Sequence, residues 1–267
     1  MAAPGRSGSH QGTDDDEPGD AHDSGTLPGP VHFRGSRELD DNGPVVETRK
    51  LYHEQLEELK DDTARLAAMA CEQVALGTQA LLDGDLAAAG TVVTGDGPLD
   101  DLTYAIEENV YLLLARQGPV AGELRTLISV LRVIHEIERC GDLMVNVAKA
   151  TRRLFPHSLD PKIRGLLERM GAQAGNQLRL SIAAFREGDV AQAEALADMD
   201  DTMDDLQKTL FRAIFAAGAA DEADLQAAVQ VALVGRYYER IADHAVNVSQ
   251  RVRFMVIGTF RSPPSER

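Results

Sequence analysis

Apolar residues along the chain follow the spacing of an α-helix from about Glu47 onward. Within residues 51–82 an apolar side is marked, mostly at spacings of three and seven positions, by Leu56, Leu59, Leu66, Met69, Val74 and Leu81. This spacing predicts one long amphipathic helix. The dipeptide Gly84-Asp85 predicts the end of that helix and the start of the next, because Gly favours a helix C-terminus and Asp favours an N-cap.

Five further helices are predicted, over residues 86–116, 120–153, 161–186, 190–217 and 222–254. The connections between them are short, except around Pro156, and short connections favour antiparallel neighbours. The predicted fold is therefore all-α, with two antiparallel three-helix bundles over residues 45–156 and 157–258, joined end to end or side by side. Residues 1–44 and 259–267 are predicted to be disordered tails, the first of them acidic and rich in Gly and Pro.

A charged decapeptide occurs twice, as ERCGDLMVNV over residues 138–147 and as ERIADHAVNV over residues 239–248, with six of ten positions identical. The turn sequences GDLAAA and GDVAQA, which begin at Gly84 and Gly188, also repeat. Because both repeats have nearly the same separation, the chain is predicted to consist of two copies of one unit.

Each copy of the decapeptide carries two carboxylates at positions i and i+4 of a helix. Glu138 and Asp142 continue a stripe of apolar residues along their helix, and Glu239 and Asp243 continue the equivalent stripe in the second copy. The apolar residues of these stripes are Leu124, Leu127, Ile128, Leu131 and Ile134 in the first copy and Leu225, Val229 and Ala232 in the second. Residues four apart share one helix face, so both pairs are expected to point toward the core. Unpaired anions there require compensation by protons, cationic side chains or metal.

A second set of carboxylates lies on the middle helix of each unit. It comprises Asp96 and Asp100 in the first half and Asp200 and Asp204 in the second. If the middle and last helices are antiparallel, these residues come level with the decapeptide carboxylates. Four carboxylates from two helices are typical ligands of oxygen-preferring cations such as iron, manganese or magnesium, and zinc is also possible.

Two alternatives remain open at this stage. Gly95, Gly97 and Pro98 are expected to interrupt the second helix, so Asp96 could cap a new segment instead of facing the cluster. The decapeptide carboxylates could also form a solvated face, or ion pairs with Arg139 and Arg240.

Composition narrows the function classes. A net charge of −16 argues against a general nucleic-acid binder and against attraction to anionic lipid. The two cysteines, Cys71 and Cys140, provide no disulfide framework, which favours a reducing compartment. No signal peptide or membrane-spanning run is recognisable, so a cytoplasmic protein is expected, in contact with a membrane only through partners.

The doubled E-R-x-x-D-x-x-V-N-V motif, the acidic segments ahead of it and the loop QGPVAGELR over residues 117–125 resemble the PhoU family of phosphate-signalling proteins. The resemblance covers residues 49–254. It implies two bundles related by a pseudo-two-fold axis and multinuclear metal clusters, with iron in some members. The implied metal ligands are Glu138, Asp142, Glu239, Asp243, Asp96, Asp100, Asp200 and Asp204.

The resemblance also implies a cytoplasmic negative regulator of the phosphate-starvation response. Its expected partners are the ATPase subunit of a phosphate ABC transporter and a sensor histidine kinase, and a homodimer is expected as well. Two other classes share these features: a di-iron carboxylate enzyme and a metal-free helical scaffold. Gly141 and Ala242 occupy the position where a di-iron enzyme of this type needs His, and the sequence contains no G-x-x-x-x-G-K or H-E-x-x-H motif. An enzyme is therefore not predicted.

Overall fold

The described part of the chain, residues 44–259 of a computed structural model, is helical and contains no strand. Its helices are α1 (Pro44–Asp83), α2 (Leu86–Thr94), α3 (Asp96–Gln117), α4 (Ala121–Leu154), α5 (Pro161–Glu187), α6 (Val190–Ala217) and α7 (Glu222–Ile257). The all-α prediction is confirmed, with boundaries within a few residues of those expected. Disorder was predicted for residues 1–44 and 259–267; of these, residues 1–43 and 260–267 lie outside the described residues, and Pro44 begins α1.

Gly-Asp pairs separate consecutive helices in both halves, as the sequence predicts. Gly84 and Gly188 have φ angles of 64° and 67°, which residues with a side chain rarely adopt. The carboxylate of Asp85 accepts hydrogen bonds from two backbone N–H groups at the start of α2, and Asp189 accepts one at the start of α6. Local sequence alone thus explains where these helices end and begin.

The predicted interruption near Gly95 divides the second of the six expected helices into α2 and α3. Gly95 ends α2 by donating its N–H to the carbonyl of Thr91, and it also precedes the first turn of α3 without a side-chain cap. Asp96 lies in that first turn, so it does not cap the new segment. The matching helix of the second half, α6, is continuous.

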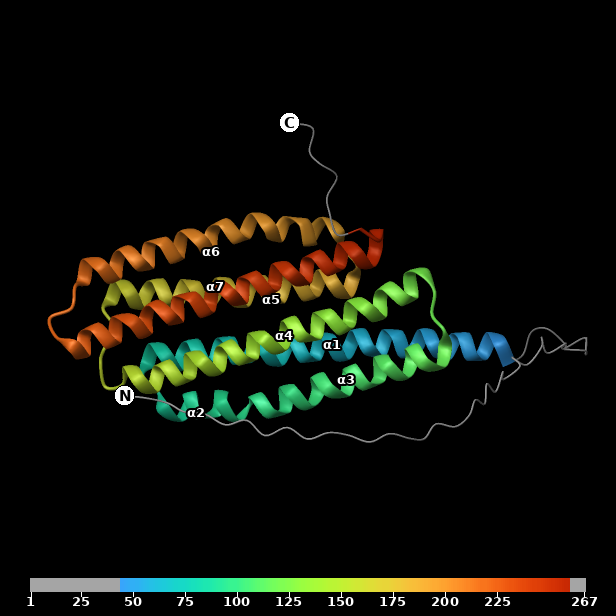
Figure 1. Ribbon diagram of the computed structural model, residues 1–267, viewed down its shortest axis with the longest axis horizontal. Helices are drawn as coiled ribbons and strands as arrows, with labels where there is room; N and C mark the ends of the chain where they lie inside the picture. The colour runs from blue at the N-terminus through green and yellow to red at the C-terminus, as the bar shows by residue number, and fades with distance from the viewer. Residues whose placement is uncertain (1–43, 260–267) are drawn as a thin grey trace, which may run out of the picture. The chain divides into compact units, whose positions relative to one another are not determined.

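The two halves pack side by side, not end to end. Helix α1 packs against α5 and α4 packs against α7, so that each contact joins one half to the other. Figure 1 shows α4 and α7 lying next to each other, with the α3–α4 turn and the α6–α7 turn at opposite ends. This antiparallel arrangement is the one expected of two halves related by a pseudo-two-fold axis.

One close contact shows how tightly the halves join. A Cβ atom added to Gly171 of α5 would lie 2.5 Å from Oγ1 of Thr78 in α1. Oγ1 of Thr78 also lies 2.9 Å from the hydroxyl of Tyr238 in α7, a side chain with no exposed surface. A glycine is therefore required where α1 and α5 approach, and a buried hydrogen bond holds α1 to α7.

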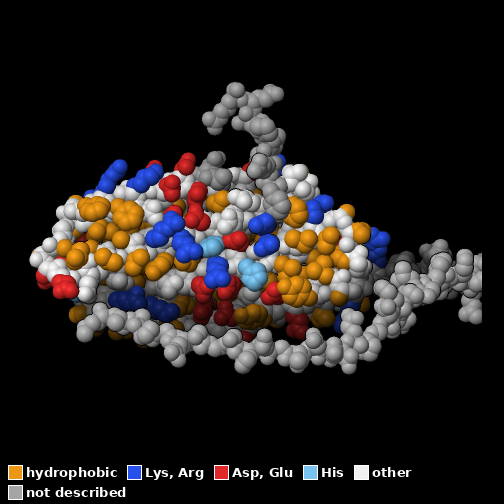
Figure 2. Space-filling view, viewed as in Figure 1, with side chains coloured by type: hydrophobic (Ala, Val, Ile, Leu, Met, Phe, Trp, Pro, Cys, Tyr) orange, Lys and Arg blue, Asp and Glu red, His pale blue; other side chains and the backbone are white. Residues whose placement is uncertain are grey.

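The apolar stripes of α4 and α7 are only partly covered. Contrary to expectation, Leu124, Ile128, Leu225 and Val229 are exposed, whereas the neighbouring Leu127, Val130 and Ile134 are buried. These residues lie within the first eight positions of α4 and α7, which the neighbouring helices do not fully cover. Figure 2 shows hydrophobic side chains gathered at both ends of this face, with charged and His side chains between them.

Candidate metal centres

The first acidic cluster consists of Asp96 and Asp100 from α3 and Glu138 and Asp142 from α4. Burial raises the pKa of Asp96, Asp100 and Glu138, and neighbouring carboxylates within the same set raise it further. The side chain of Glu138 is 23% exposed and that of Asp142 is 44% exposed. The antiparallel packing of α3 on α4 therefore brings the four carboxylates together at the edge of the core, as predicted.

Arg139 partly compensates this cluster. Its Nε lies 3.6 Å from Glu138 Oε2, and its Nη1 donates to Asp142 Oδ2 at 3.0 Å. The ion pair considered from the sequence is thus present. The pKa of Glu138 is nevertheless raised, since burial and the charge of Asp142 outweigh the more exposed guanidinium.

The second acidic cluster consists of Asp200 and Asp204 from α6 and Glu239 and Asp243 from α7. Burial raises the pKa of Asp200 and of Glu239, and in both cases the charge of Asp243 is the next cause. The side chain of Glu239 is only 12% exposed, and its Oε2 is buried without a hydrogen-bond partner. Asp204 is exposed. A buried carboxylate oxygen without a donor is the feature that a cation would satisfy.

The second half also contains an ion pair, but its arginine is not the one considered from the sequence. Glu239 pairs with Arg236, three residues before it, and not with Arg240. Arg236 and Glu239 share a helix face because they are three positions apart.

The eight carboxylates form two groups, but within residues 44–259 no three His, Cys, Asp or Glu side chains are already arranged as ligands of one ion. Glu138, Asp142 and Glu239 each contact an arginine through one of their two carboxylate oxygens. The donor set itself fits hard cations, because it offers only oxygen atoms. The assignment of these residues as metal ligands remains a prediction.

A third polar group, which the sequence did not predict as a unit, joins α4 to α7. Oε2 of Glu136 accepts a hydrogen bond from Nδ2 of Asn247 at 3.1 Å and lies 2.7 Å from Nδ1 of His244. Burial alone would raise the pKa of Glu136, but the hydrogen bonds from His244 and Asn247 hold it below its ordinary value. Asn247 belongs to the repeated decapeptide, and it makes a contact between helices. Glu136 lies just before the repeat and gave no signal.

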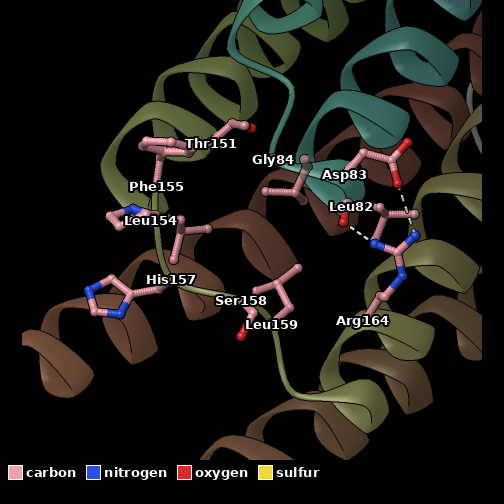
Figure 3. Close-up of a pocket in the computed structure, with 12 residues that line it drawn as sticks. Leu82, Asp83, Gly84, Thr151, Leu154, Phe155, His157, Ser158, Leu159 and Arg164 are labelled. Atoms are coloured by element: carbon pink, nitrogen blue, oxygen red, sulfur yellow. Dashed lines mark hydrogen bonds and ion pairs between the residues drawn. The ribbon is translucent and has the colours of Figure 1, made fainter.

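A cavity of about 340 Å³ lies where α4 leads into α5, lined by residues including Leu82, Leu154, Leu159 and Arg164. Figure 3 shows the Arg164 guanidinium turned toward the carbonyl of Leu82 and the carboxylate of Asp83, both of which it contacts. The only guanidinium at this cavity is thus engaged, and leucines make up much of the remaining wall. The residues that line this cavity include a single carboxylate, Asp83, and therefore form no group comparable to the acidic clusters.

Both cysteine thiols are free. Cys140 is fully buried and Cys71 is partly buried, and burial raises the pKa of the Cys71 thiol to about 11. Neither is a reactive thiolate near neutral pH. Among the described residues, no helix is both long and apolar enough to cross a lipid bilayer.

The fold and the clusters define a class: a duplicated helical bundle in which each half presents four carboxylates from its last two helices. The family model described as the PhoU domain matches this chain twice, over residues 63–151 and 167–252, one match in each half. The chain belongs to the PhoU family, as the doubled decapeptide indicated.

Relatives are similar over nearly their whole length. The phosphate-specific transport system accessory protein PhoU homolog 2 of Mycobacterium tuberculosis is 37% identical over 216 residues, covering 79% of this chain and 99% of the relative. PhoU homolog 1 of Mycobacterium leprae is 36% identical over 213 residues, covering 79% of this chain and 95% of the relative. The crystal structure of PhoU from Pseudomonas aeruginosa superposes with a TM-score of 0.73 at 27% identity and covers 78% of this chain and 100% of that one. The two mycobacterial relatives are named as accessory proteins, in agreement with the prediction of a non-enzymatic protein.

Proposed function

We propose that this protein regulates phosphate uptake as an accessory protein of a phosphate-specific transport system. The names of its relatives support this role, since the Mycobacterium tuberculosis and Mycobacterium leprae proteins are described in those terms. More specifically, the protein is proposed to be a homodimeric negative regulator in the cytoplasm. It would link the ATPase subunit of a phosphate ABC transporter to a sensor histidine kinase. The family resemblance supports these partners.

In this proposal the two acidic clusters bind metal. The metal is iron in a multinuclear cluster, and the alternatives are manganese, magnesium and zinc. The observation that carries it is the equivalent placement of both clusters at the edge of the core, where the pKa of Glu138 and of Glu239 is raised. A bound cation would supply positive charge to carboxylates that repel one another. Carboxylates on both helices of a cluster would bind the same metal centre, so the first cluster would hold α3 to α4 and the second would hold α6 to α7. Partner proteins would bind the surface that results.

A second candidate is a metal-free scaffold with the same partners. The ion pairs favour it, because Arg139 contacts both Glu138 and Asp142, and Arg236 contacts Glu239. In that case arginine would compensate the carboxylates permanently, and metal would have no role in the regulator.

Elemental analysis of full-length protein purified without added metal separates the two candidates. The Glu239→Ala/Asp243→Ala variant should contain less metal than the natural chain. A matched control is Glu222→Ala/Asp224→Ala, which removes two carboxylates from the first turn of α7, away from both clusters. Equal metal content in all three proteins would reject the metal site of the second half.

The regulatory role is tested in cells that lack the protein. Phosphate-uptake genes should be expressed in phosphate-rich medium when the gene is deleted, and repression should return with the natural chain. Unchanged expression after deletion would reject the regulatory role regardless of the metal result.

A further inference from the structure

A glutamine of α1 adjoins the first acidic cluster and has an unsatisfied amide oxygen. Gln73 is 7% exposed, and its Oε1 is buried without a hydrogen-bond partner. This oxygen lies 3.3 Å from the point where a Cβ atom of residue 141 would stand, and Oδ1 of Asp96 lies 3.4 Å from the same point. The amide oxygen and the carboxylate are therefore directed at one small space beside the backbone of α4.

Such an amide is unusual in a helical core. A buried carbonyl oxygen without a donor loses its hydrogen bonds to water and gains nothing in return, so a core position of this kind normally carries an apolar side chain. An amide carbonyl is, however, a common neutral ligand of hard cations, next to carboxylates. The feature that is costly in the metal-free protein is useful if a cation lies between Gln73 and Asp96.

The glycine at position 141 makes the arrangement possible. A methyl group there would press on Oε1 of Gln73, on Oδ1 of Asp96 and on Leu99, all at 3.3 to 3.4 Å. In the second half the corresponding residue is Ala242, which is fully buried. The equivalent glutamine, Gln177, is also fully buried, and both polar atoms of its amide lack partners. Each half thus keeps a buried amide on its first helix, but only the first half provides this space.

We infer that the amide oxygen of Gln73 is a neutral ligand of the cation bound by the first acidic cluster, beside Asp96, and that Gly141 gives it access. This inference rests on the proposed metal-binding function. It makes the first centre a mixed amide and carboxylate site, contributed by three helices in place of two. The cation would therefore also join α1 to the α3–α4 pair.

The test uses full-length protein with the changes Glu239→Ala and Asp243→Ala, so that the first cluster dominates binding, and Mn²⁺ as the probe in calorimetric titration. In this background Gln73→Leu should weaken Mn²⁺ binding by about tenfold or more, the loss typical of a residue that supports a metal centre. Gly141→Ala should weaken it as well. Gln73→Glu should bind Mn²⁺ at least as tightly as the background, because it keeps an oxygen at the same place and adds charge. Gln177→Leu is the matched control and should have no effect.

Each result bears on a distinct claim. Thermal melts of the metal-free proteins confirm that the variants fold, and removal of the unpaired amide in Gln73→Leu should not lower the melting temperature. If Gln73→Leu binds Mn²⁺ as tightly as the background, the inference fails while the metal function stands. If the background binds no Mn²⁺ but the natural chain does, the first centre and this inference fail together. If the natural chain binds none, the proposed metal function fails as well.

Discussion

Substituting Gly171 by Ala tests the claim that the two halves are held in close contact. The added Cβ would lie 2.5 Å from Oγ1 and 2.6 Å from Cγ2 of Thr78, so Thr78 or the helices must move by roughly 1 Å to reach ordinary contact. Overpacking of this kind costs about 1–3 kcal/mol. Moving Thr78 also leaves the buried hydroxyl of Tyr238 without its partner, which costs about 1–3 kcal/mol more.

One term acts in the opposite direction, because Ala favours a helix interior over Gly by about 1 kcal/mol. The net destabilisation should therefore be about 1–5 kcal/mol. For a chain with a helical region of this size, that corresponds to a fall in melting temperature of roughly 2–20 °C. Thermal and urea unfolding followed by far-ultraviolet circular dichroism would measure it.

Gly165→Ala is the control, since Gly165 lies in the same helix and an added Cβ would have no neighbour within 4 Å. That variant should be unchanged or more stable by up to about 1 kcal/mol. Thr78→Ala should remove the two closest contacts and leave only Cβ of residue 78 at 3.1 Å, so Gly171→Ala should cost less in the Thr78→Ala background than in the natural chain. If Gly171→Ala behaves like Gly165→Ala, the close approach of α1 and α5 is refuted.

Two further predictions concern polar contacts between the halves. Glu136→Ala should lower the free energy of unfolding by about 1–3 kcal/mol, because it leaves His244 and Asn247 without their shared acceptor. Glu136→Gln should cost less, because it retains an acceptor oxygen. Equal urea midpoints for Glu136→Ala and the natural chain would contradict this prediction. The pKa of Asp83 is lowered by the hydrogen bonds from Gln79 and Arg164, so its stabilising contribution is present above its unfolded pKa of 3.8 and is lost as the pH falls through the lower folded value. The difference in melting temperature between the natural chain and Asp83→Asn should therefore shrink between about pH 5 and pH 2, and a difference that does not change over this range would rule out the Asp83–Arg164 link.

The two halves have diverged where function is proposed. The break at Gly95 gives the first half a short α2, places Asp96 in the first turn of α3, and has no counterpart in the continuous α6. The space beside Gly141 is filled by a methyl group at Ala242. Two centres built from the same repeat are therefore expected to differ in their ligands, and binding measurements should resolve two affinities for a cation.

The sequence alone determined the helices and the duplication. Apolar periodicity, Gly-Asp pairs and the interruption at Gly95 act between residues only a few positions apart, so their consequences can be derived without the fold. The grouping of Asp96, Asp100, Glu138 and Asp142 also followed, because two antiparallel helices joined by a short turn have a nearly predetermined register.

Only the tertiary structure decided how the halves meet and which polar groups are buried. Thr78 and Tyr238 are 160 positions apart, and Glu136 and His244 are 108 apart; no local pattern specifies such contacts. For the same reason the exposure of Leu225 and the unsatisfied amide of Gln73 were not predicted. Burial is a property of the surrounding helices, whereas periodicity describes only the helix that carries the residue.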